Sequence, residues 1–211
     1  MEKNNFNEQD SLKLINEMIS QAKNNIQVGT ADGMIRAGYS ASIIAVLNII
    51  LIYTLPNPYL SFFAWTLMIP VTIIGHYIDK KKDRSSIVKT HIDTIISKTW
   101  LAFSCSVWIL ILTIISMSYI LHEWTLTILI MPTILTLTGL AQYITGIACR
   151  YKPFTNAAYI FGAGAIMCVL LMLVAGEYFG VGQFIILIVC MITGFCIPGH
   201  IMNKKAKEQY V

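Results

Sequence analysis

The sequence contains six apolar stretches, each long enough to cross a lipid bilayer as a helix. An α-helix rises about 1.5 Å per residue, so about 20 residues span a hydrocarbon core roughly 30 Å thick. None of the six contains Asp, Glu, Lys or Arg, and a charge at the centre of a membrane helix costs about 2.5–3.5 kcal/mol. The stretches are residues 38–55, 59–78, 99–121, 125–148, 157–176 and 183–202.

Composition excludes several other classes of protein. The chain is 56% hydrophobic and 12% charged, whereas about a quarter of the residues in a soluble domain are charged. Such a chain is neither disordered, nor a soluble nucleic-acid binder, nor a disulfide-stapled secreted domain. Strands of a membrane barrel would alternate apolar and polar residues, and residues 108–115 and 184–192 do not alternate. The sequence therefore predicts an all-α, polytopic membrane bundle of six transmembrane helices.

The distribution of Lys and Arg predicts which side of the membrane each connection faces. Cytoplasmic connections of membrane proteins are enriched in these residues. With the N-terminus inside, the cytoplasmic parts are an N-terminal segment (1–37), a loop (79–98), a turn (149–156) and a basic tail (203–211). Together they hold all 15 Lys and Arg residues. We therefore expect a transmembrane domain over residues 38–202 in the cell inner membrane, with both termini cytoplasmic.

Two cytoplasmic segments are predicted to be amphipathic helices. In Ser11–Ile26 the apolar residues share one stripe at helical spacing, and the same holds for Ser86–Lys98. The first stripe would be buried on the inner leaflet or the bundle, or on a protein partner, and the sequence leaves both open. The stripes are Leu12, Ile15, Met18, Ile19, Ala22 and Ile26, then Ile87, Val88, Ile92, Ile95 and Ile96.

The cytoplasmic loop opens with a basic cluster of Lys80, Lys81, Lys82 and Arg84. Each basic residue close to the membrane surface is attracted to anionic headgroups by about 1 kcal/mol. Such a cluster can also serve only to set topology, because every segment on that side is basic. A bilayer with an anionic inner leaflet is the first expected partner. No nucleic-acid partner is expected, and the sequence leaves oligomerisation open.

The fourth span, residues 125–148, is the most polar. Pro132 removes a backbone hydrogen bond and predicts a kink. Asn48 in the first span is the other deep polar residue and a candidate partner for the fourth span. These residues either line a polar path for a solute or join helices through hydrogen bonds. On the fourth span the polar face consists of Thr138, Gln142 and Thr145, with Gly139 and Gly146 beside it.

The sequence shows no arrangement typical of catalysis or of metal binding. His76 and His200 lie near the inner ends of two spans, but no third ligand has a recognisable spacing. The five cysteines form no Cys-x-x-Cys pair, and buried cysteine usually behaves as a small apolar residue. We therefore expect no enzyme activity, no cofactor, no metal and no disulfide.

Three stretches resemble a family of uncharacterised six-span integral membrane proteins of the Bacteroidetes. They are SLKLINEMISQAKNNI, MPTILTLTGLAQYITGIACRYKP and IPGHIMNKK, and the resemblance covers nearly the whole chain. In that family a Tyr tends to follow the closing Pro-Gly, where this chain has His200, which implies that His200 is not a metal ligand. The resemblance supports the six-span architecture and implies no activity, substrate or cofactor.

Two functions are consistent with these features. The first is a non-enzymatic accessory or sensory membrane module that binds a partner through Ser11–Ile26 and Ser86–Lys98. The alternative is a small-solute transporter or channel that uses the polar face of the fourth span. Transporters normally carry charged or densely polar groups at mid-depth, and this chain offers only Asn48, Thr138 and Gln142 there. The sequence therefore favours the first function.

Overall fold

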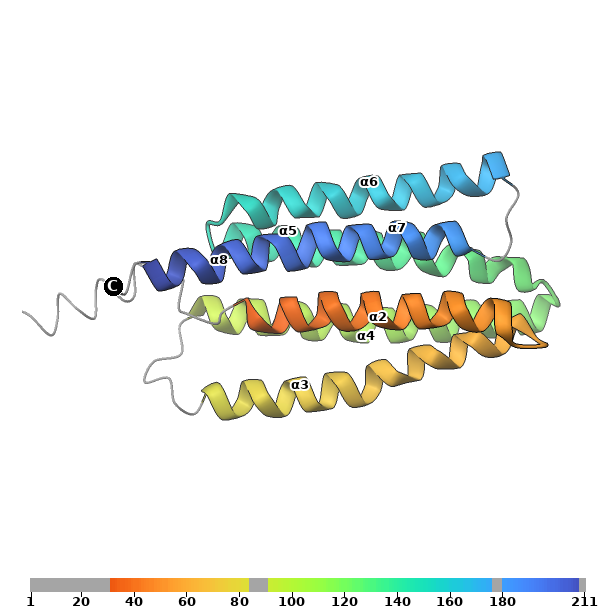
Figure 1. Cartoon of the computed structure of the whole chain (residues 1–211), viewed down its shortest axis with the longest axis horizontal. Coiled ribbons are helices and arrows are strands. Elements are labelled where there is room, and N and C mark those ends of the chain that lie inside the picture. The colour runs from red at the N-terminus through yellow and green to blue at the C-terminus, as the bar shows by residue number, and fades with distance from the viewer. Residues whose placement is uncertain (1–30, 84–90, 176–179, 209–211) are drawn as a thin grey trace, which may run out of the picture.

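The computed structural model describes residues 31–83, 91–175 and 180–208. Within these residues the chain is helical apart from short turns, and six helices are long and apolar enough to cross a membrane. Figure 1 shows the helices side by side along one long axis. The six-span, all-α prediction is confirmed at this level, and the architecture is that of a multi-pass membrane protein.

Three of the six spans are composite helices that change type along their length. The second span is η1 continued by α3, the fourth is η2 continued by α5, and the sixth runs through α7, η3 and α8 without interruption. The elements are α2 (Asp32–Thr54), η1 (Pro58–Leu67), α3 (Met68–Asp83), α4 (His91–Leu121), η2 (Trp124–Leu129), α5 (Ile130–Ala148), α6 (Lys152–Ala175), α7 (Val181–Met191), η3 (Ile192–Cys196) and α8 (Ile197–Glu208).

A proline lies close to one change of helix type in each composite span. Pro70 and Pro132 follow the junctions at which 3-10 helices η1 and η2 become α-helices, and Pro198 follows the π-helix η3. A proline has no N–H, so the carbonyl four residues earlier loses its α-helical partner. Turns of a different pitch accompany the prolines; at the end of η3, for example, the Ile197 N–H donates to the carbonyl of Ile192, five residues earlier. The irregularity predicted at Pro132 therefore takes the form of a 3-10 segment before it.

The helices extend beyond the predicted spans at the end of the bundle that carries Arg36, Arg150 and the lysines of α8, here called the basic end. α2 begins at Asp32 rather than at residue 38, and the sixth span continues to Glu208 rather than ending at 202. Charged residues suit these ends, because an acid in the first turn and lysines in the last turn complement the helix dipole. Hydropathy thus marks the hydrocarbon core, whereas the helices continue into the headgroup region.

The amphipathic helix predicted for Ser11–Ile26 lies outside the described residues. Of Ser86–Lys98, the part from His91 onward belongs to α4, which continues into the third span without a break. A separate second amphipathic helix is therefore not seen in the described part of the chain.

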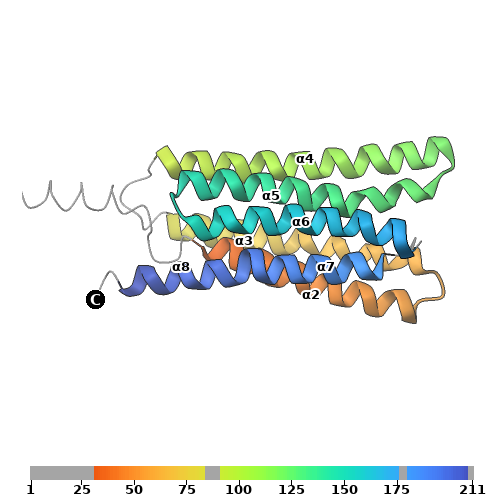
Figure 2. The same cartoon turned by 90° about the horizontal axis from the view of Figure 1, so that it is seen from above.

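The buried core is formed by α2, α5, α6, α7 and η3. Only 11% of the apolar window of the second span and 6% of that of the third are buried, against 33–50% for the other four. In Figure 1, α3 diverges from α2 towards the basic end, and Figure 2 shows α4 at the edge of the bundle beside α5. The central cluster is Ala41, Ala45, Met131, Leu135, Phe161, Ala165, Cys168, Phe184, Leu187, Cys190, Met191 and Phe195.

The closest approach of two helices in the core is between α5 and α6. A Cβ atom at Gly139 would lie 3.0 Å from the carbonyl oxygen of Ala158, and one at Gly146 would lie 2.6 Å from the backbone nitrogen of Thr155. Both neighbours are backbone atoms, which cannot move aside as a side chain can. Small residues are the usual means by which membrane helices pack closely, so these glycines set the separation of α5 and α6.

We expect Gly146→Ala to lower the free energy of unfolding by about 1–3 kcal/mol, because the added methyl group overpacks a backbone contact. Gly162→Ala is the matched control, since nothing lies within 4 Å of a Cβ atom there. The control should be neutral or stabilising by up to about 1 kcal/mol. The unfolding of both variants in detergent, monitored by circular dichroism, tests this prediction. Equal free energies of unfolding for the two variants would contradict it.

Candidate functional site

The two threonines of the predicted polar face are satisfied within α5. Thr138 and Thr145 are fully buried. Thr138 Oγ1 donates to the carbonyl of Ile134 at 2.7 Å, and Thr145 Oγ1 donates to the carbonyl of Ala141 at 2.8 Å. A hydroxyl that donates to the backbone carbonyl four residues earlier on its own helix does not connect that helix to a neighbour.

Gln142 differs from the two threonines, because its amide is buried without a partner. Its side chain is 0% exposed, and neither Oε1 nor Nε2 has a hydrogen-bond partner within the described residues. Position 142 lies between Gly139 and Gly146, in the stretch of α5 that packs closest to α6. Lipid supplies no hydrogen bonds there, so the amide remains an unsatisfied polar group in an apolar interior.

Asn48 contacts the second span rather than the fourth. Its Nδ2 donates to the carbonyl of Ser61, in η1, at 2.8 Å, while its Oδ1 has no partner within the described residues. Asn48 lies towards the end of α2 opposite the basic end, whereas Gln142 lies near the basic end of α5. At about 1.5 Å of rise per residue, the two amides lie at different depths and do not form one polar site.

The predicted headgroup cluster lies at the end of the most divergent helix. Lys80, Lys81 and Lys82 belong to the last residues of α3, and Arg84 lies outside the described residues. Figure 1 shows that end of α3 well separated from α2. The cluster is therefore on one edge of the basic end.

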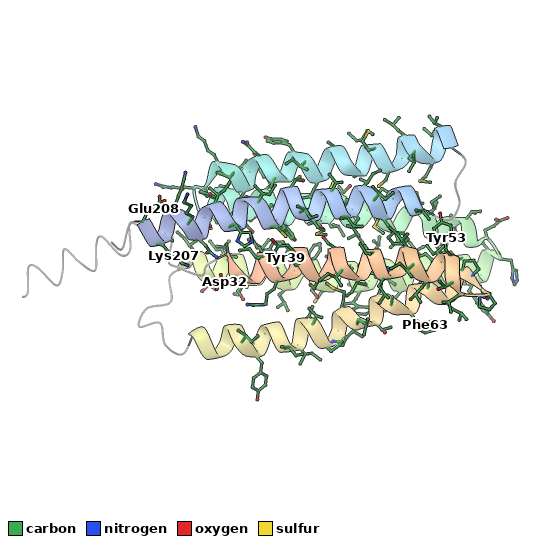
Figure 3. The ribbon with its side chains drawn as sticks, in the orientation of Figure 1. Asp32, Tyr39, Tyr53, Phe63, Lys207 and Glu208 are labelled. Atoms are coloured by element: carbon green, nitrogen blue, oxygen red, sulfur yellow. The ribbon has the colours of Figure 1, made fainter. Side chains whose placement is uncertain are left out.

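A set of polar contacts that the sequence analysis did not identify joins the first and last spans at the basic end. Asn203 Nδ2 donates to Asp32 Oδ1 at 2.7 Å. Tyr39 Oη and His200 Nε2 are 3.1 Å apart, within hydrogen-bonding distance. Figure 3 shows Asp32 and Tyr39 along α2, beside α8. These contacts link the first span to the last span at the basic end.

The histidines considered as metal ligands have no metal-binding surroundings in the described part of the chain. His200 contacts Tyr39. No group of three His, Cys, Asp or Glu residues in the described ranges could hold a metal ion.

Comparisons with protein-family models, with curated proteins and with solved structures found no match for the chain.

We expect Gln142→Leu to raise the free energy of unfolding by about 1–3 kcal/mol, because an apolar side chain of similar size replaces a buried, unsatisfied amide. Asn48→Leu is the matched control and should be destabilising, since it removes the bond to Ser61. Denaturant titration in detergent measures both. A loss of stability in Gln142→Leu would show instead that the amide has a polar partner in the membrane.

Proposed function

We propose that this protein is a non-enzymatic membrane module, accessory or sensory in role, that acts by binding another membrane protein through α4. We further propose that it lies in the cell inner membrane with both termini in the cytoplasm, because all Lys and Arg residues fall in the connections on one side. The predicted Ser11–Ile26 helix is a second proposed contact with that partner.

The observation that carries this proposal is a stripe of small side chains on the exposed face of α4. Ala102, Ser106, Thr113 and Ser116 follow one another at intervals of four, seven and three residues, so they share one face, and all four are exposed, as is the larger Ile109 between them. α4 is also the least buried of the six spans. Membrane helices pack through small residues, which allow their backbones to approach closely. A face directed only at lipid has no need of them.

The opposite side of α4 is the one that attaches it to the bundle. The Trp100 ring, near the basic end, packs edge-on against Phe195 of η3, with ring centroids 5.6 Å apart. Ser118, near the other end, is fully buried. The small-residue stripe therefore remains available while α4 is held in place.

The alternative function, transport of a small solute along the polar face of the fourth span, depends on Gln142. Thr138 and Thr145 donate within their own helix, which leaves Gln142 as the only member of that face with unpaired donor and acceptor atoms. A single buried amide on α5 is weak support for a solute path. The exposed stripe on α4 is stronger support for the binding of a partner protein. Unchanged solute flux in vesicles that contain Gln142→Leu would remove this alternative.

A photo-activated cross-linking residue at position 106 tests the α4 proposal in native membranes. We expect a cross-linked adduct that contains a second polypeptide, because a partner helix would lie against Ser106. Position 166 on α6 is the matched control, since Ile166 is 63% exposed on a span with a substantial buried face. Equal adducts at both positions, or lipid adducts only, would contradict the proposal. The mass of the adduct distinguishes another protein from a second copy of this chain.

A further inference from the structure

Two segments that are distant in the sequence bring five cationic residues together at the basic end. Lys205 Nζ lies 6.0 Å from the centroid of the Tyr151 ring, which places the turn between α5 and α6 next to the end of α8. Figures 1 and 2 both show this turn beside α8, and Figure 3 marks Lys207 and Glu208 at the end of that helix. The cations are Arg150, Lys152, Lys204, Lys205 and Lys207.

The five cations outnumber the acidic residues in this part of the described chain, where Glu208 shares the last turn of α8 with Lys205 and Lys207. None of the five side chains makes an ion pair there. The first turn of α6 contains no acidic residue, so the positive end of its helix dipole adds to the same charge. The patch therefore attracts an anion from outside the chain.

Arg150 has a backbone conformation that suits glycine better than arginine. Its φ is 52°, and it occupies the turn that ends α5, where Tyr151 N–H donates to the carbonyl of Gly146 at 2.9 Å. This is the helix C-terminal position at which glycine is usual, because an L-residue there is strained. Strained backbone positions of this kind are enriched at ligand-binding sites. Here the guanidinium group is exposed at the cationic patch.

The turn that carries Arg150 is rigidly held. Tyr151 is only 6% exposed and packs with Phe154 and Met202 in a second buried cluster. Burial raises the pKa of the Tyr151 phenol above its ordinary value, so the ring remains neutral under the lysine. Arg150 and Lys205 are therefore presented by fixed backbone on two adjacent elements.

We propose that Arg150, Lys152 and Lys205 form a binding site for the phosphate group of an anionic phospholipid. The planar guanidinium of Arg150 binds two phosphate oxygens at once, and the lysines add charge. Exposed apolar side chains continue from the site towards the membrane centre, with Ile147 one turn from Arg150 and Ile201 one turn from Lys205. They provide a surface for acyl chains, which favours a lipid over a free phosphate. The site is distinct from Lys80–Lys82 on α3.

Thermal unfolding of the full chain in neutral detergent, with phosphatidylglycerol or phosphatidylcholine added, tests this site. We expect phosphatidylglycerol to raise the melting temperature of the protein and phosphatidylcholine to leave it unchanged. Arg150→Gly should melt about 2–4 °C higher than the native chain without lipid, because glycine relieves the strain. The same variant should bind phosphatidylglycerol about fivefold more weakly, since one basic contact is lost.

His122→Gly is the matched control, because His122 is the other non-glycine residue with a positive φ in the described chain, at 55°, and lies at the end opposite the site. It should gain similar stability and keep its affinity for phosphatidylglycerol. Lys205→Gln, which leaves the turn intact, should weaken lipid binding as well. Native lipid affinity in both Arg150→Gly and Lys205→Gln would overturn the proposal. Equal stabilisation by free glycerol 3-phosphate would assign the site to a soluble phosphate instead.

Discussion

A hydrocarbon environment offers no hydrogen-bond partner to a polar group, and the structure depends on this constraint. Helices meet it for the backbone, and short hydroxyl side chains meet it by bonding back to their own helix. Ser42 donates to the carbonyl of Gly38, Thr113 to that of Ile109 and Thr133 to that of Leu129. Hydroxyl residues in these spans are therefore no sign of a polar path. The amides of Asn48 and Gln142 are the informative polar groups, one bonded across to η1 and the other left unpaired.

The six spans divide into a packed core and two peripheral helices, and this division separates structural from functional roles. Glycines in α2, α5, α6 and η3 bring the core helices into close contact; a Cβ atom at Gly38, for example, would lie 2.8 Å from Cys196 Sγ. α3 and α4 add little to that core. The small-residue stripe of α4 therefore lies outside the core and is exposed, whereas Arg150 and the lysines of α8 gather at the basic end of the core.

Hydropathy and the absence of charges were sufficient to predict the six spans, and Pro132 predicted an irregularity in the fourth span. The Asn48 contact could in part have been predicted, because Asn48 and Ser61 lie on either side of the short turn that joins the first two spans. The contacts Asp32–Asn203 and Tyr39–His200 could not, since they depend on which spans are neighbours in the bundle. The strain at Arg150 was equally hidden, because the sequence shows an ordinary basic loop there.

The contact between the first and last spans has a consequence for biosynthesis. α2 leaves the ribosome early, but the surfaces it packs against in α7, η3 and α8 are made last. Until the sixth span is inserted, α2 has only its hairpin partner, whereas α5 and α6 can associate as soon as they are made. Assembly of the core therefore awaits synthesis of the sixth span, and a nascent chain arrested before Val181 would present the core face of α2 to the lipid and to the cell's quality-control machinery.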